Sequence, residues 1–211
     1  MSDAVAALVR DADRDRWLAT LYAPATLRSA LLAVHALDLE LAKVAATTTD
    51  AMLGEIKLAW WRERLVDLDA GIVLAQPVLQ ALAADVLPEG VTGATLAGFE
   101  DAWLALAADD VARHVALRGA AVGGALAALA GGDAATGTRL GTAWAAGEAA
   151  RTGHTVAIPE RLRVAPPLRW LAGLAALGLR DVLRAGQGLP PEPRATAGRQ
   201  WVLLRVALTG R

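Results

Sequence analysis

Residues 53–65 read LGEIKLAWWRERL and place two adjacent tryptophans among five charged side chains. Projected at 100° per residue, the apolar side chains of this segment and its continuation fall on one broad arc: Leu53, Ile56, Trp60, Trp61, Leu65 and Leu68. Lys57 and Arg64 project into the middle of the same arc. The pattern predicts a core helix with two inward cations, which would need carboxylate or phosphate partners.

Helical character extends along the whole chain. Alanine, leucine and valine dominate its 211 residues, and no β-like segment is long enough to build a sheet. Proline, glycine and polar runs separate the predicted helices, which cover residues 3–21, 25–46, 51–69, 76–86, 95–117, 120–129, 134–151, 167–177 and 194–208. We therefore expect one all-α domain over residues 1–211.

Composition excludes several functional classes. Lys and Arg number 21 against 22 Asp and Glu, so no basic excess points to nucleic acid. There is no cysteine, which excludes disulfides and thiolate chemistry. The uncharged segment 119–132 is too short to span a bilayer, and the N-terminus is too acidic for a secretory signal. We expect a cytoplasmic protein, at most peripheral to the membrane, with no transmembrane segment.

The preceding predicted helix supplies a partner for the two cations. Asp38 lies at the centre of its apolar face, with His35 on the flank. A short loop would make the two helices antiparallel neighbours, so we predict that Asp38 pairs with Lys57 or Arg64. Such a pair is either a structural clamp between core helices or part of a polar pocket for an anionic ligand.

Three segments resemble the squalene/phytoene synthase family. They are DRWLA…LYAP at residues 15–24, AVHALDLELA at residues 33–42 with Arg28 before it, and LGEIKLAWWR at residues 53–62. The closest resemblance is to the branch that contains a mitochondrial respiratory complex I assembly factor and its bacterial relatives. Weaker similarity continues through residues 141–159, so that the resemblance covers roughly residues 11–208. It implies a helical bundle of the isoprenoid synthase type.

The resemblance also implies a chemistry that this sequence does not support. Active members condense two prenyl diphosphates with Mg²⁺ held by two aspartate-rich motifs, because Mg²⁺ needs clustered hard oxygen ligands. Here Ala42, Lys43 and Ala46 stand at the expected aspartates of the first motif. The second motif retains one carboxylate, Glu148. We therefore assign no catalytic residue, no metal ligand and no cofactor.

The leading interpretation is a catalytically degenerate member with a binding or assembly role in respiratory complex I biogenesis. Its expected partners are an anionic amphiphile such as a prenyl phosphate, and respiratory-chain assembly proteins. The residues expected to line its cavity are Arg28, His35, Asp38, Lys57, Trp60, Trp61 and Arg64.

Two alternatives to this interpretation stay open. One is an active prenyltransferase with an atypical Mg²⁺ site around Asp38, Glu40 and Glu148. The other is a structural interaction protein with a collapsed cavity.

Two further patterns have structural interpretations. Asp11, Asp13 and Asp15 lack the glycine turn and closing glutamate of a calcium loop, so we expect a helix start and a solvated face. The glycine pairs at 123–124 and 131–132 lack the spacing and preceding strand of a nucleotide-binding loop. Their expected role is close packing of helices.

Overall fold

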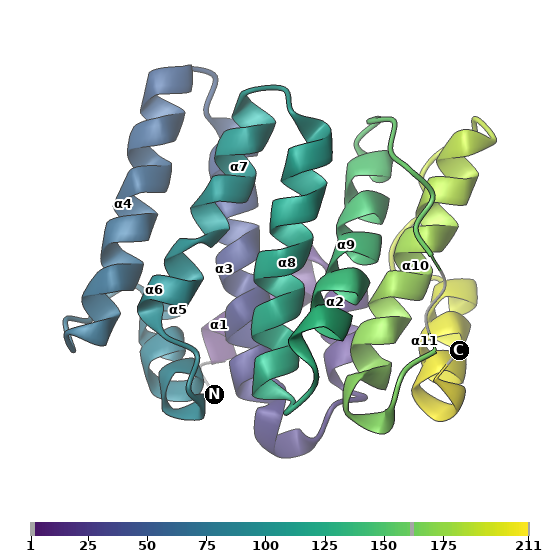
Figure 1. Cartoon of the computed structure of the whole chain (residues 1–211), viewed down its shortest axis with the longest axis horizontal. Coiled ribbons are helices and arrows are strands. Elements are labelled where there is room, and N and C mark those ends of the chain that lie inside the picture. Colours follow the sequence, from purple (N-terminus) through teal and green to yellow (C-terminus); the bar gives the residue numbers. More distant parts are fainter. Residues whose placement is uncertain (1–2, 161–162, 211) are drawn as a thin grey trace.

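The computed structural model describes residues 3–160 and 163–210, and within them it contains helices and no strand (Figure 1). The α-helices are α1 Asp3–Ala12, α2 Arg14–Thr20, α3 Arg28–Thr47, α4 Ala51–Asp69, α5 Pro77–Ala81, α6 Gly93–Ala97, α7 Phe99–Ala107, α8 Val111–Leu129, α9 Ala134–Arg151, α10 Arg169–Gly186 and α11 Ala197–Thr209. Short 3₁₀ turns at Ala25–Leu27, Leu87–Glu89 and Pro166–Leu168, and a π turn at Leu82–Val86, join them. The predicted all-α fold is confirmed.

Polar side chains set the helix starts, and two of them break helices that were predicted as continuous. Asp13 accepts hydrogen bonds from the N–H groups of Asp15 and Arg16, which separates α1 from α2 within the predicted helix 3–21. Asp110 caps α8 in the same way, directly after Asp109 at φ 58°. The predicted helix 95–117 is therefore divided among α6, α7 and α8. The predicted break near residue 118 is absent, because α8 continues to Leu129.

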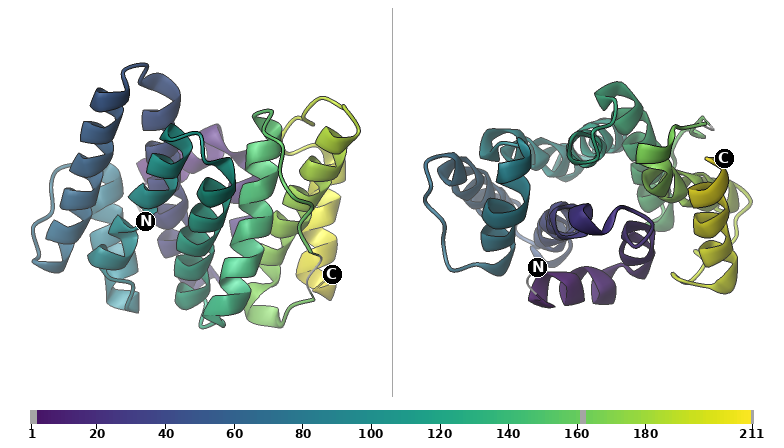
Figure 2. Two further views of the ribbon diagram at one scale, coloured as in Figure 1. Left: turned by 45° about the horizontal axis from the view of Figure 1, so that its top comes forward. Right: turned by 90° about the horizontal axis from the view of Figure 1, so that it is seen from below.

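Helix α3 is the centre of the bundle. All of residues 30–38 are buried, so the helix is covered on every side in this segment. It contacts α1, α2, α4, α5, α7 and α8, and the view from below in Figure 2 shows it inside the surrounding helices. A helix that is apolar all round is typical of a core position. Within residues 30–38, Asp38 and His35 are the polar side chains, and both are fully buried.

Helix α4 lies at one edge of the molecule (Figure 1) and buries a narrower face than predicted. Trp61, Leu65 and Leu68 are in the core, together with Leu58. The remaining members of the predicted arc are exposed: Leu53 at 45 %, Ile56 at 58 % and Trp60 at 39 %. The prediction of one broad buried arc was wrong, because α4 has core neighbours along only part of its circumference.

Glycines bring α8, α9 and α10 into backbone contact. A Cβ on Gly141 of α9 would collide with the carbonyl oxygen of Gly119 in α8, and one on Gly123 would collide with that of Gly137. A Cβ on Gly147 of α9 would likewise collide with the Cα of Gly178 in α10. The expectation that Gly123 permits close packing is confirmed. Gly124, in contrast, has no atom within 4 Å of an added Cβ.

Gly141→Ala is expected to lower the free energy of unfolding by about 1 to 3 kcal/mol, because the extra methyl group forces α8 and α9 apart. Gly124→Ala is the matched control, and should be neutral or stabilise by up to about 1 kcal/mol through helix propensity. Urea unfolding of both variants measures the difference. Equal stabilities for the two variants would contradict the close approach of α8 and α9.

None of the helices in the described ranges combines the length and the apolar character that a membrane span requires.

Candidate functional site: a buried arginine–aspartate network

Asp38 of α3 is held from both sides by two buried arginines. Arg118 of α8 donates from Nε to Oδ1 at 2.9 Å and from an Nη to Oδ2 at 2.7 Å, the bidentate geometry that guanidinium favours. Arg16 of α2 donates from Nη1 to Oδ2 at 2.7 Å. Both oxygens of Asp38 are thus occupied by cations contributed by segments 22 and 80 residues away. The three side chains are almost fully buried.

Aromatic rings cover the two guanidinium groups. Arg118 lies between Trp103 and Trp144, with its Cζ 4.7 Å from each ring centre. Arg16 lies 4.5 Å from the ring centre of Trp144. Stacking on indole lowers the cost of removing a guanidinium from water, and it fills the space around Asp38 with side chains.

Asp13 and Glu148 extend the network toward the surface. Asp13 Oδ2 pairs with Nε of Arg16 at 2.9 Å and with Nη1 of Arg194 at 3.0 Å. Glu148 Oε2 of α9 pairs with Nη2 of Arg194 at 2.7 Å and lies 3.8 Å from Nη2 of Arg16. Arg16 therefore connects Asp38 to Asp13 and to Glu148.

A second part of the network connects the C-terminal helix α11 to α2 and α10. Arg199 of α11 donates to Asp15 of α2 at 2.8 Å, and to both oxygens of Asp181 in α10 at 2.6 and 2.9 Å. Asp15 also accepts the backbone N–H of Ala195. Arg151 of α9 lies 3.4 Å from Asp181. The expectation of a solvated face was wrong for Asp13 and Asp15, which are about 1 % exposed.

The pKa values follow from these contacts. Burial would raise the pKa of Asp38, but Arg118 and Arg16 outweigh it and hold the pKa well below its ordinary value. At Glu148, burial likewise raises the pKa, but the positive charges of Arg194 and Arg16 outweigh it and lower the pKa to about 2. Burial raises the pKa of Asp13 despite its arginine partners. The network holds Asp38 and Glu148 as carboxylates balanced by guanidinium groups.

His35 packs beside this network without joining it. The side chain is fully buried, and neither ring nitrogen has a hydrogen-bond partner among the residues that the structure describes. Burial, and next the positive charge of Arg16, lower its pKa to about 3, whereas Asp38 opposes the shift. The neutral imidazole is therefore the form present in the folded protein at neutral pH.

Acid is expected to destabilise the protein through His35. His35 binds a proton near pH 6.5 in the unfolded chain and only near pH 3 in the folded chain. The contribution of neutral His35 to the free energy of unfolding is therefore complete above pH 6.5 and is lost as the pH falls below it. The loss amounts to about 1.4 kcal/mol per pH unit for one proton. The free energy of unfolding, measured with urea at several pH values between 7.5 and 5, should fall less steeply with decreasing pH for His35→Leu than for the wild type. Parallel curves over that range would show that His35 takes up its proton in the folded state as well.

Comparison with known proteins finds a family match for the N-terminal part of the chain. Residues 9–102 match the squalene/phytoene synthase family model. No curated protein and no solved structure matches the chain. The matched segment contains Arg16 and Asp38, whereas Arg118 and Glu148 lie beyond its end. The resemblance of later residues to the squalene/phytoene synthase family, and to its assembly-factor branch, stays a prediction.

In a squalene/phytoene synthase, Mg²⁺ would need free carboxylate oxygens at the centre of the bundle. Here both oxygens of Asp38 accept N–H groups, and the Oε2 atom of Glu148 faces two guanidinium groups. Among residues 3–160 and 163–210, no group of three or more metal-ligating side chains has suitable geometry. The side chains around Asp38 therefore do not fit Mg²⁺ in this arrangement.

The residues predicted to line a common cavity do not come together. Asp38 and His35 lie at the buried centre, but Lys57 is exposed and bonds to the hydroxyl of Thr48 at 3.1 Å. Arg64 pairs with Glu63 and with Asp67 on its own helix. The predicted pairing of Asp38 with Lys57 or Arg64 was wrong, because α3 turns Asp38 toward α2 and α8 instead of α4.

The other predicted residues have separate environments. Arg28 donates to the carbonyl oxygens of Ala23 at 3.1 Å and Leu21 at 2.7 Å, which closes the turn after α2. Trp60 and Trp61 contact each other edge to face, with ring centres 5.3 Å apart and planes at 82°. Trp61 packs in the core and Trp60 reaches the surface. The hydrogen bonds and ion pairs of Asp38 in the described ranges are with Arg16 and Arg118 and involve none of these three side chains.

Sequence reasoning missed the arginines that hold the site. Arg16 carried a usable signal, because it stands among Asp13, Asp15 and Trp17 in a segment with family resemblance. Arg118 carried none, since alanine and glycine surround it and its partner is 80 residues away.

Proposed function

We propose that the chain is a squalene/phytoene synthase-like bundle that does not condense prenyl diphosphates and acts by binding, in an assembly role. The main support is the contact of Asp38 with Arg16 and Arg118. In a diphosphate-metal site, carboxylates must be free to ligate a cation. Here the guanidinium groups of Arg16 and Arg118 bind both oxygens of Asp38 and balance its charge, which supports a centre that does not ligate Mg²⁺.

Turnover assays test the loss of chemistry. Purified protein is incubated with Mg²⁺ and farnesyl or geranylgeranyl diphosphate, and pyrophosphate release is measured. We expect no release above the rate without protein. Mg²⁺-dependent release by the wild type that is lost in Glu148→Gln, but kept in the exposed control Glu55→Gln, would overturn the proposal. It would favour the alternative of an active prenyltransferase with an atypical metal site.

For the assembly role, we propose respiratory complex I biogenesis as the process, in the cytoplasm or at the membrane surface. This assignment rests on the resemblance of residues 15–24, 33–42 and 53–62 to the assembly-factor branch. The test is affinity capture of the tagged chain from its native host, combined with complex I activity in a deletion strain. We expect complex I subunits or assembly proteins in the eluate, and lowered complex I activity with unchanged activity of other respiratory complexes. Normal complex I activity in the deletion strain would contradict the role.

A further inference from the structure

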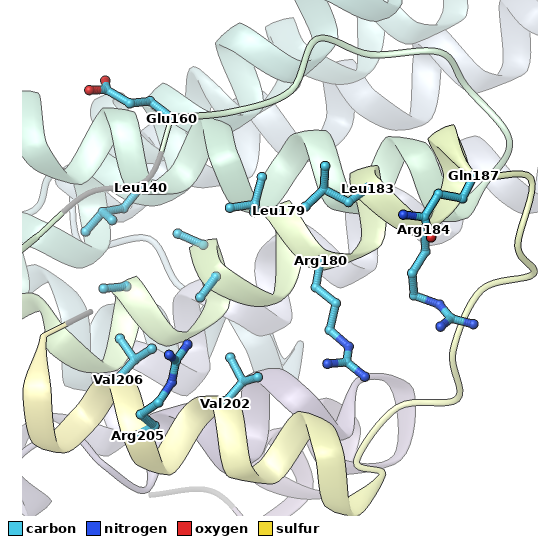
Figure 3. Close-up of a pocket in the computed structure, with 13 residues that line it drawn as sticks. Leu140, Glu160, Leu179, Arg180, Leu183, Arg184, Gln187, Val202, Arg205 and Val206 are labelled. Atoms are coloured by element: carbon cyan, nitrogen blue, oxygen red, sulfur yellow. The ribbon is translucent and has the colours of Figure 1, made fainter.

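A groove of about 600 Å³ lies between α10 and α11, outside the arginine–aspartate network (Figure 3). Its floor is apolar and consists of Ala175, Ala176, Leu179, Val202 and Val206. The close-up shows Val202 and Val206 rising from α11 toward α10. The volume falls in the range of pockets for small molecules, which combine an apolar lining with a few placed polar groups.

Three arginines stand along this groove, and two of them are not balanced by carboxylates. Arg180 pairs with Glu192 at 2.8 Å. Arg184 donates to the carbonyl oxygen of Pro190 at 3.1 Å, and its buried Nε has no partner in the described ranges. Within the same ranges, neither Arg184 nor Arg205 has a carboxylate in salt-bridge distance. The groove therefore combines an apolar floor with two guanidinium groups available to an anion.

The one carboxylate that lines the groove does not cancel this charge. Glu160 is exposed and pairs with Arg139 at 2.7 Å. Figure 3 shows its side chain directed away from the other labelled residues. The excess of positive charge therefore stays with Arg184 and Arg205.

The groove is also long. A second cavity of about 700 Å³ lies between the C-terminal half of α10 and the segment from Gly153 to Ile158. Leu183 and Gln187 line both cavities, so the two adjoin along α10. A flexible hydrocarbon chain can follow such a path, whereas a compact polar metabolite would leave the apolar floor uncovered.

We propose that this groove binds a single-chain anionic amphiphile. Its phosphate or carboxylate head is held by Arg205, which rises from α11 beside Val202 and Val206. Its apolar chain covers Ala176, Leu179 and Val202 and runs along α10 toward Arg184 at the other end of the groove (Figure 3). Guanidinium groups recognise such oxygens through charge-assisted hydrogen bonds, and the apolar floor gains from removal of water. The site lies away from Asp38, so it stands whether or not the centre of the bundle retains activity.

The test is calorimetric titration with dodecyl phosphate below its aggregation concentration. We expect a 1:1 complex with a micromolar Kd. Dodecyl maltoside, with the same chain and a neutral head, should bind at least about tenfold more weakly, since it cannot accept charge-assisted hydrogen bonds. Inorganic phosphate should not bind in the micromolar range. Equal affinity for the neutral amphiphile, or for phosphate alone, would overturn the proposal.

Variants assign the complex to the groove. Arg184→Gln combined with Arg205→Gln should weaken dodecyl phosphate binding by at least about tenfold. Ala176→Phe should weaken it by obstructing the floor while both arginines remain. Arg113→Gln on the exposed face of α8 is the control and should bind as the wild type does. Thermal melting of each variant checks that it is folded. Wild-type affinity in the doubly substituted variant would contradict the site even if Ala176→Phe fails to fold.

Two other occupants would give different results. A stable dimer in light scattering, which Val202→Glu dissociates, would assign the groove to a second copy of the chain and overturn the proposal. Binding to anionic phosphatidylglycerol vesicles without binding to monomeric dodecyl phosphate would assign it to a membrane surface and overturn the proposal as well.

Discussion

Replacement of Asp38 by alanine is expected to lower the free energy of unfolding by about 3 to 5 kcal/mol. It leaves the buried guanidinium group of Arg118 without a carboxylate partner in the described ranges, and it removes one of the carboxylate partners of Arg16. Arg16 and Arg118 lose three hydrogen bonds of 2.7–2.9 Å. Both guanidinium groups also stack on indole rings, Arg16 on Trp144 and Arg118 on Trp103 and Trp144. The matched control is Asp101→Ala on the exposed surface of α7, which should cost less than about 0.5 kcal/mol.

A triple substitution separates the effect of unpaired buried charges on stability from the effect of lost side-chain volume. Asp38→Leu combined with Arg16→Met and Arg118→Met removes these three charges and preserves much of the volume. Asp13 and Glu148 lose Arg16 but keep Arg194 as a partner. Such replacements of buried ion networks are often neutral or stabilising. We therefore expect the triple variant to be more stable than Asp38→Ala. Equal costs for Asp38→Ala and Asp101→Ala in urea unfolding would show instead that water solvates the network.

Replacement of Arg199 by methionine is the second large effect that we expect, at about 3 to 5 kcal/mol. It removes the closest cation from the buried carboxylates of Asp15 and Asp181, which Arg199 contacts at 2.6–2.9 Å. Their other arginine partners are more distant, with Arg194 at 3.6 Å from Asp15 and Arg151 at 3.4 Å from Asp181. Because these contacts join α11 to α2 and α10, amide hydrogen exchange in α11 should also increase. Arg205→Met on the same helix is the control, since Arg205 is exposed and has no carboxylate in salt-bridge distance within the described ranges.

Two outcomes would contradict this role of Arg199. One is a loss of stability in Arg199→Met no larger than that in Arg205→Met. The other is unchanged amide hydrogen exchange in α11, which would show that the contacts with Asp15 and Asp181 do not hold this helix in place.

The sequence predicted the secondary structure better than the partners of the buried charges. Apolar periodicity and breakers identified the helical class, the bounds of α4 and of α9, and the central position of Asp38 on its helix. These features depend on residues close together in the chain. The start of α2 at Asp13 agrees with the helix start expected there, although the helix was also predicted to run through it. Helix capping by Asp110 was missed, because its side chain competes locally with a helix that composition alone would continue.

The pairing of Asp38 could not be predicted from sequence proximity. Lys57 and Arg64 were the nearest cations on a neighbouring helix, and helical projection placed them inward. The direction in which α3 turns Asp38 decided otherwise. It depends on the packing of α3 against α8 and of α4 against α6 and α7, which lie much later in the chain. Arg118 enters the site only because the glycines of α8 let that helix pack closely against α9 and bring Trp144 beside it. Such long-range choices leave no local pattern in the sequence.

The central claim is that arginines, and not a metal with diphosphate, occupy the middle of the bundle. The most direct test follows the indole N–H signals of the seven tryptophans by NMR during addition of Mn²⁺ with farnesyl diphosphate, since Mn²⁺ prefers the same oxygen ligands as Mg²⁺ and broadens nearby resonances. We predict that the signals of Trp103 and Trp144, which stack on Arg118, broaden no more than that of exposed Trp201. Selective broadening of Trp103 and Trp144 that Glu148→Gln abolishes would place a metal beside Asp38 and contradict the account.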